Sequence, residues 1–192
     1  MSTFTFRNDD DRRVIKEVIE DKCYTQWNIV KLTGTILDCG AHIGAFTKLC
    51  LLEGVNKVIA VEPHPDNFNL LQQNCKDRRV TFINKAISTK PLKLTCSERS
   101  DLHKLGDEGL EVATISLDEL LTEPIDVLKM DIEGGEYDAL YTAKNLDKVK
   151  QITMEYHNGG TAMAHLLIFL EKQGFTLKWI GGQEWGLMYL QR

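Results

Sequence analysis

Acidic and polar side chains stand at the ends of successive short apolar runs in this sequence. Such runs predict buried strands, and the side chains that follow them are Asp38, Glu62, Asn84, Asp131 with Glu133, and Glu155 with His157. Because open α/β sheets bind ligands beyond the carboxyl ends of their strands, we expect these residues to surround one pocket. Carboxylates and an imidazole there could bind the hydroxyl groups of a ligand and remove a proton from a reacting alcohol.

The first of these strand ends carries two glycines whose spacing selects among ligands. The expected strand 35–39 is followed by Gly40 and Gly44, and the pattern then becomes helical. A dinucleotide-binding turn needs glycine where this sequence has His42, and an imidazole there would obstruct a pyrophosphate. The pattern Asp-x-Gly-x-x-x-Gly instead favours S-adenosyl-L-methionine (SAM), which has a ribose and a small zwitterionic tail. Asp38 could hold the ammonium group of that tail, directly or through water, or bond its own loop amides.

Glu62 ends the second expected strand, residues 57–61. A carboxylate at this place can accept hydrogen bonds from both hydroxyl groups of a ribose. The alternative is a carboxylate stabilised by the dipole of the helix that begins near Pro65. We favour the ribose-binding role.

The elements that position these residues alternate between strand and helix. Strands are expected at 35–39, 57–61, 80–84, 125–130, 151–156, 175–180 and 185–190. This order predicts an α/β fold with a parallel sheet covered by helices on both faces, to which the final hairpin adds an antiparallel edge. Residues 1–30 are expected to form a helical lead-in, either a flap over the ligand face or merely a cover for the sheet. Residues 31–192 are expected to form one domain, with a variable insertion at 89–112.

Composition and charge argue against several classes of protein. Hydrophobic residues make up 43% of the 192 positions and charged residues 27%, as in soluble globular proteins. The net charge of −5 does not favour a long nucleic acid as partner. No segment approaches the roughly 18 to 20 apolar residues of a membrane span, and the first residues lack the apolar core of a signal peptide. We therefore expect a cytoplasmic protein that does not contact a membrane.

Several motifs of this sequence resemble those of the SAM-dependent methyltransferases of the FkbM type. They are Asp38-Cys39-Gly40-Ala41-His42-Ile43-Gly44, Val61-Glu62-Pro63, Leu71-Gln72-Gln73-Asn74, Ala86-Ile87-Ser88, Ser116-Leu117-Asp118-Glu119-Leu120, Leu128-Lys129-Met130-Asp131-Ile132-Glu133-Gly134-Gly135-Glu136 and Glu155-Tyr156-His157. The resemblance spans about residues 34–157, and the Lys-x-Asp-x-Glu-Gly-x-Glu block is its most specific part. Two positions depart from the pattern: His42 where the family commonly has asparagine, and Thr142 where it often has glycine.

The resemblance implies a Rossmann-like class I methyltransferase fold with a mostly parallel seven-stranded sheet, SAM as methyl donor and usually an oxygen atom as acceptor. The residues expected around SAM are Asp38, Gly40, Ala41, His42, Ile43, Gly44, Glu62, Pro63, Asn84, Ala86 and Asp131. Substrate choice is expected in the lead-in and the insertion, which match no motif. The acceptor is therefore expected to be a small molecule or a sugar-like compound, and a second subunit of a homodimer could complete its pocket.

Methyl transfer to an alcohol needs a correctly placed acceptor and a base within hydrogen-bond reach. Asp131 is the first candidate for this base and His157 the second, while Glu155 and Glu133 complete the set of candidate catalytic residues. An alternative is that these four side chains bind one divalent metal ion, magnesium or manganese, which would acidify the acceptor hydroxyl. Glu136 is interpreted as a carboxylate at a helix N-terminus.

Three other functions use the same features of the sequence. One is methylation of a nucleic acid, which would need a basic groove with aromatic residues. Another is a non-catalytic SAM-binding partner subunit, and the last is a nicotinamide-dependent dehydrogenase. Aromatic residues of the terminal hairpin are expected to pack in the core or at the sheet edge rather than to stack on a substrate; they are Trp179, Trp185 and Tyr189.

Overall fold

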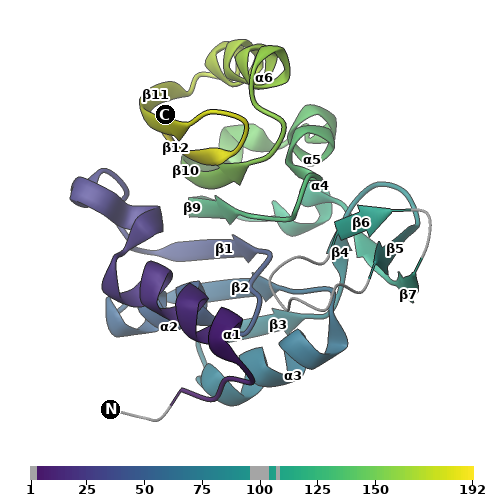
Figure 1. Ribbon diagram of the computed structural model, residues 1–192. Coiled ribbons are helices and arrows are strands. Elements are labelled where there is room, and N and C mark those ends of the chain that lie inside the picture. Colours follow the sequence, from purple (N-terminus) through teal and green to yellow (C-terminus); the bar gives the residue numbers. More distant parts are fainter. Residues whose placement is uncertain (1–3, 96–103, 107–108) are drawn as a thin grey trace.

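A seven-stranded sheet with the strand order β11-β12-β10-β9-β1-β2-β3 forms the centre of the computed structural model (Figure 1), which describes residues 4–95, 104–106 and 109–192. The strands are β1 (Thr35–Cys39), β2 (Lys57–Val61), β3 (Val80–Ile83), β9 (Ile125–Met130), β10 (Val149–Tyr156), β11 (Thr176–Gly182) and β12 (Gly186–Gln191). Strands β10, β9, β1, β2 and β3 pair in parallel, and β12 pairs antiparallel with both β10 and β11. The expected mostly parallel sheet is confirmed, although the antiparallel strand β12 lies second from the edge and β11 forms the edge.

The chain order reverses between β1 and β9. From β1 the strands continue outward through β2 to β3, whereas β9 lies on the other side of β1 and leads to β10. This reversal is the topological switch point of an open α/β sheet, where a crevice for ligands forms beyond the strand ends. The polar residues at the ends of β1, β2, β9 and β10 therefore face one edge of the sheet.

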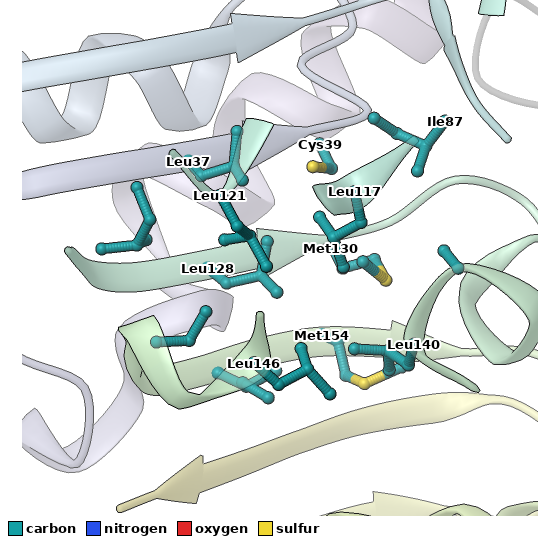
Figure 2. Packing of buried hydrophobic residues seen from close by; sticks show 14 of the residues in the cluster. Leu37, Cys39, Ile87, Leu117, Leu121, Leu128, Met130, Leu140, Leu146 and Met154 are labelled. Carbon is teal, nitrogen blue, oxygen red and sulfur yellow. The ribbon is translucent and has the colours of Figure 1, made fainter. Parts of the chain in front are cut away.

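Alternating residues of each strand feed two separate apolar clusters, one on each face of the sheet. In β1, Ile36 belongs to one cluster and Leu37 to the other, and in β9 Val127 and Leu128 divide in the same way. The run Ile125–Met130 is almost continuously buried because helices cover both faces. Figure 2 shows part of one cluster, in which side chains of β1, β9 and β10 pack with those of the neighbouring helices.

The helices divide between the two faces. Leucines of α4 (Leu117–Leu120), α5 (Glu136–Thr142), the 3-10 turn η3 (Leu146–Lys148) and α6 (Thr161–Lys172) belong to the first cluster. Residues of α2 (Ala45–Leu52), α3 (Pro65–Asn74) and the N-terminal segment belong to the second. Helix α3 begins with Pro65 at its first position, and α4 begins with a capping box formed by Ser116 and Glu119. None of the described helices is long and apolar enough to cross a membrane.

The lead-in and the insertion have structure of their own. The lead-in contains α1 (Asp9–Ile15), a π-helical turn η1 (Lys16–Glu20) and a 3-10 helix η2 (Cys23–Asn28). The insertion contains β5 (Leu92–Thr95), β6 (Lys104–Gly106) and β7 (Leu110–Val112), which form a small antiparallel sheet. Two short strands, β4 (Ala86–Ile87) and β8 (Thr114–Ile115), pair in parallel where the chain leaves and rejoins the main fold. The insertion is described only in part, because residues 96–103, 107 and 108 lie outside the described residues.

Candidate active site

The glycine loop between β1 and α2 is packed too closely for larger residues. Gly40 has a φ of 78°, and a Cβ atom on it would lie 1.7 Å from the carbonyl oxygen of Asp131. Gly44 has a φ of 96°, and a Cβ there would lie 2.7 Å from the sulfur of Cys75. The close neighbour of Gly44 is therefore the C-terminal end of α3. Both positions need glycine because of backbone conformation and space together.

Asp38 lies behind this loop. It is fully buried, its Oδ2 accepts a hydrogen bond from the Thr47 hydroxyl at 2.6 Å, and its Oδ1 lies 3.4 Å from Lys129 Nζ. The ammonium group of Lys129 also donates to the carbonyl oxygen of Gly40 at 2.7 Å. These contacts make Asp38 a residue that shapes the loop, and its direct contact with the ammonium group of a ligand stays a prediction.

Lys129 is a buried lysine for which the sequence predicted no role. Burial alone would lower its pKa, but the nearby carboxylates of Asp38 and Asp131 raise it above the usual range. Its Nζ atom also lies 5.1 Å from the centre of the Tyr24 ring. The end of β9 therefore carries a permanent positive charge between two carboxylates.

Tyr24 of the lead-in reaches the same place. Its hydroxyl donates a hydrogen bond to Asp131 Oδ2 at 2.7 Å, while its backbone carbonyl accepts one from Thr153 at 2.9 Å. Burial and the Asp131 carboxylate raise the pKa of Tyr24 well above its usual value, so the phenol stays protonated. Asp131 Oδ1 is buried and has no hydrogen-bond partner among the described residues. The lead-in thus contacts both β10 and Asp131, and its role as a flap over the ligand face stays a prediction.

A narrow cavity of about 70 Å³ lies beside Glu62. The Glu62 carboxylate accepts hydrogen bonds from the backbone N–H groups of His42 (2.8 Å) and His64 (2.9 Å) and from the Asn67 amide (3.4 Å). Burial raises the pKa of Glu62 to about 7, although these hydrogen bonds oppose the shift. The residues that line the cavity are Gly40, His42, Val61, Glu62, Pro63, Asn67, Lys85, Ala86, Ile87, Leu94, Asp131, Ile132 and Glu133.

The remaining predicted cofactor residues lie around this cavity without lining it. Ala41 and Ile43 are buried in the loop. The side-chain amide of Asn84 donates to the backbone carbonyls of Glu62 (2.8 Å) and Pro63 (3.0 Å). These residues hold the shape of the cavity wall in this structure.

A second, much wider cleft of about 1460 Å³ opens beyond the ends of β9 and β10. The four predicted catalytic residues, Asp131, Glu133, Glu155 and His157, all line it. Ile87, Asp131 and Glu133 line both cavities, so the two spaces meet at the end of β9.

The catalytic candidates form one charged cluster. His157 Nε2 lies 3.5 Å from Glu133 Oε2, and the ligand atoms of Asp131, Glu133 and His157 lie within 4.8 Å of one another. Burial opposes the charge on His157, but the hydrogen bond with Glu136 and its negative charge raise the pKa of His157 to about 9. Burial, followed by the charge of Asp131, raises the pKa of Glu155 to about 8. At neutral pH the imidazole is therefore mostly protonated, which does not favour His157 as a base.

Glu136 is the first residue of α5, as the sequence predicted, but it does more than stabilise the helix end. It is fully buried and accepts hydrogen bonds from the backbone N–H groups of Ile132 (3.0 Å) and Gly134 (3.1 Å). Its Oε1 atom also lies 3.1 Å from His157 Nδ1. Glu136 therefore fixes both the turn after β9 and the orientation of the imidazole.

The aromatic residues of the terminal hairpin divide into two kinds. The ring of Trp179 stacks on the buried Tyr189 with 5.2 Å between ring centres, in agreement with the packing role expected for both. Trp185, in contrast, is 68% exposed and lines the wide cleft. The packing expected for Trp185 is wrong, because the turn between β11 and β12 holds this residue away from the core.

Comparison with known proteins gives a consistent result. A family model describing the methyltransferase FkbM domain matches residues 38–177. The chain is 31% identical over 137 residues to the hexuronic acid methyltransferase AglP of Haloferax volcanii, covering 64% of this chain and 55% of the archaeal protein. It is 25% identical over 210 residues to the 31-O-demethyl-FK506 methyltransferase FkbM of Streptomyces tacrolimicus, covering 84% and 80% of the two chains. The chain thus spans little more than half the length of the first relative.

Solved structures share the fold at low sequence identity. A methyltransferase FkbM from Methylobacillus flagellatus superposes with a TM-score of 0.62 at 16% identity, over 88% of this chain and 48% of that one. TrmK of M. capricolum, solved with S-adenosyl-homocysteine (SAH), superposes with a TM-score of 0.58 at 10% identity, over 89% and 66% of the two chains.

Proposed function

The chain belongs to the FkbM methyltransferase family, and from this premise we propose that it transfers the methyl group of SAM to a hydroxyl group of a small, sugar-like acceptor. The observation that carries the proposal is the junction of the two cavities at Asp131, with Glu62 in one and the charged cluster in the other. A donor in the narrow space and an acceptor in the wide one would meet beside a carboxylate. The names of the two relatives, one acting on a hexuronic acid and one on an oxygen of FK506, support an oxygen acceptor.

Residues of the narrow cavity fit the donor. The bare backbone of Gly40, the carboxylate of Glu62 and the wall formed by Ala86 would contact the loop-side, ribose and base portions of SAM. When bound, SAM supplies a methyl group that is already activated on a sulfonium. The narrow cavity itself is smaller than a nucleoside, so we expect β5, whose Leu94 lines it, to move outward on binding.

Asp131 is the residue we assign to proton removal. Its side chain lines both cavities and is oriented by the hydrogen bond from the Tyr24 hydroxyl to Oδ2, so its carboxylate could accept the proton of an acceptor hydroxyl. In the transfer the acceptor oxygen gains the new C–O bond, the methyl–sulfur bond breaks with its electrons left on sulfur, and the proton passes to Asp131. Positioning of the acceptor in line with that bond supplies much of the rate.

Calorimetric titration tests the donor half of the proposal. We expect SAM and SAH to bind while NAD does not, and replacement Glu62→Ala to weaken SAM binding by about 1–3 kcal/mol through lost charged hydrogen bonds. Glu171→Ala, an exposed carboxylate on α6, is the matched control and should leave SAM affinity unchanged. Unchanged affinity in Glu62→Ala would contradict the ribose role, and preferred binding of NAD would contradict the proposed function.

A further inference from the structure

Carboxylates occur on every wall of the wide cleft. Glu17 comes from the lead-in, Asp138 from α5 and Glu184 from the hairpin turn, while Asp131, Glu133 and Glu155 lie at the strand ends. Within the described residues, Asp138, Glu155 and Glu184 form no ion pair with a cationic side chain. Burial, followed by the charge of Asp131, raises the pKa of Glu155 to about 8, so this carboxyl group is mostly protonated at neutral pH and the negative charge of the cleft comes from the other carboxylates.

The cationic groups that face the cleft are already balanced or peripheral. Arg13 lies 3.9 Å from Asp10 and 3.5 Å from Glu17. His157 lies between Glu133 and Glu136, at 3.5 and 3.1 Å. Lys90, the remaining cation of the lining, is exposed on the loop before β5. A ligand entering the cleft therefore meets a negative potential.

Trp185 adds an aromatic surface to this charged wall. The residue is 68% exposed, and its backbone turn is anchored: the Gly159 N–H donates to the Glu184 carbonyl at 2.7 Å, joining the hairpin turn to the loop after β10. A Cβ atom on Gly182 would lie 2.2 Å from the Trp185 carbonyl oxygen, so the turn is tightly closed. An exposed indole and carboxylates that line the same cleft can together bind an ammonium group, through cation–π and ionic attraction.

We propose that the acceptor is an amine-bearing polyol, such as an amino sugar, whose protonated amine binds between Trp185 and the carboxylates of the wide cleft while a hydroxyl group reaches Asp131. The proposal rests on the proposed function, because it takes the wide cleft as the acceptor site. A uronic acid, the compound class named for the archaeal relative, would bring a further negative charge into this cleft. We expect this chain to discriminate against it.

The test compares three methyl glycosides of one ring: the glucosaminide, the glucoside and the glucuronide. Each is titrated into the full chain saturated with SAH, and SAH production from SAM is followed in parallel. We expect the amine to bind at least about tenfold more tightly than the neutral sugar, equivalent to about 1.4 kcal/mol, with the glucuronide weakest. Added salt should reduce the preference, because the attraction is partly long-range.

Two variants of the hairpin turn test whether it produces the preference for the glucosaminide. Glu184→Gln and Trp185→Ala should each lower affinity for the glucosaminide by about fivefold to tenfold while SAH affinity stays constant. Their controls are Glu171→Gln, an exposed carboxylate on α6, and Leu177→Ala, an exposed apolar residue of the same hairpin that does not line the cleft. Equal effects in variants and controls would overturn the assignment to Trp185 and Glu184.

Other outcomes overturn the acceptor class. The glucuronide binding as tightly as the glucosaminide, or more tightly, would do so. The same holds if none of the three glycosides binds while SAH still binds. In a further experiment, Mn²⁺ is added to protein that has first been stripped of metal with EDTA. If Mn²⁺ binds tightly and abolishes the preference for the amine, a metal ion held by Asp131, Glu133 and His157 occupies the negative site instead. Loss of SAH binding by the wild-type chain would contradict the proposed function itself, so the two failures are distinguishable.

Discussion

Around the narrow cavity, backbone groups make most of the polar contacts, whereas charged side chains dominate the wide cleft. Glu62 is held by two backbone N–H groups, and Gly40 presents bare backbone. At the ends of β9 and β10, by contrast, Asp131, Glu133 and His157 are arranged by one another and by Glu136. A wall of backbone groups suits one invariant ligand, while a wall of side chains can change with the ligand it binds. Under our proposal, the difference teaches that the glycine-loop pattern indicates the donor, whereas the acceptor has to be inferred from individual side chains.

The replacement Asp131→Asn should separate the two regions most strongly. Loss of the base should lower methyl-transfer turnover by about a thousandfold, or about 4 kcal/mol in the barrier, while SAH affinity changes little. Glu171→Gln, an exposed carboxylate on α6 that does not line the cleft, is the control and should retain most activity. Single-turnover kinetics and calorimetry on both variants measure the two quantities. Retained turnover in Asp131→Asn would mean that another residue removes the proton.

Gly40→Ala should damage both regions together, because this glycine touches the end of β9. We expect the free energy of unfolding to fall by about 3 kcal/mol from overlap with the Asp131 carbonyl and from backbone strain. Gly54→Ala is the matched control: Gly54 has a similar φ of 82°, and nothing lies within 4 Å of a Cβ added there. Strain alone should cost that variant about 1 kcal/mol in urea denaturation. If both variants lost the same free energy of unfolding, close packing around Gly40 would not contribute to the effect.

The stability of the folded chain should fall as the pH rises from about 5 to 9. The folded-state pKa of Glu62 is raised to about 7, that of Glu155 to about 8 and that of His157 to about 9, so each contributes stability at low pH that is lost as pH rises through these values. Glu62 alone would account for about 3 kcal/mol at most. Urea denaturation at several pH values should show that Glu62→Gln reduces the pH dependence of the free energy of unfolding in the lower part of this range. Glu155→Gln should reduce it in the upper part. Rising stability would contradict the burial of both carboxylates.

A smaller effect is expected from Glu136→Gln. The variant keeps an oxygen for the turn but removes the charge beside His157, so the pKa of His157 should fall by about one unit. NMR titration of the imidazole measures this directly. Asp138→Asn, two residues further along α5, should leave the His157 titration unchanged. A shift of equal size in both variants would indicate a general charge effect instead of a positioning contact.

Much of the fold could be predicted because its signals are local. The apolar runs of β1, β2 and β9, the glycine loop and the polar strand ends each lie within a few residues, and the switch point of a parallel sheet brings the ends together. The same logic placed Asp131 and His157 in one cleft. The antiparallel edge formed by the final hairpin was also predicted, and the structure adds that the last strand, β12, is the neighbour of β10.

Other site residues gave no local signal. Tyr24 lies 107 positions before Asp131, and nothing near it in the sequence marks the hydrogen bond between them. Lys129 sits inside an apolar run, where alternation alone does not reveal a buried ammonium group between two carboxylates. The exposure of Trp185 depends on a turn closed by Gly182, which composition does not show. Contacts made across the sheet therefore mark the limit of what the sequence could predict.

Because Tyr24 donates a hydrogen bond to Asp131, the base that we propose, we expect activity to depend on a segment outside the FkbM-type motifs. Tyr24 is anchored on both sides, through Thr153 to β10 and through an edge-on ring contact with Phe46 of α2. Detachment of residues 9–28 would release one carboxylate oxygen and open the covered face of α2, while the seven strands stay paired. Limited proteolysis within the lead-in should therefore abolish turnover well before it abolishes the fold.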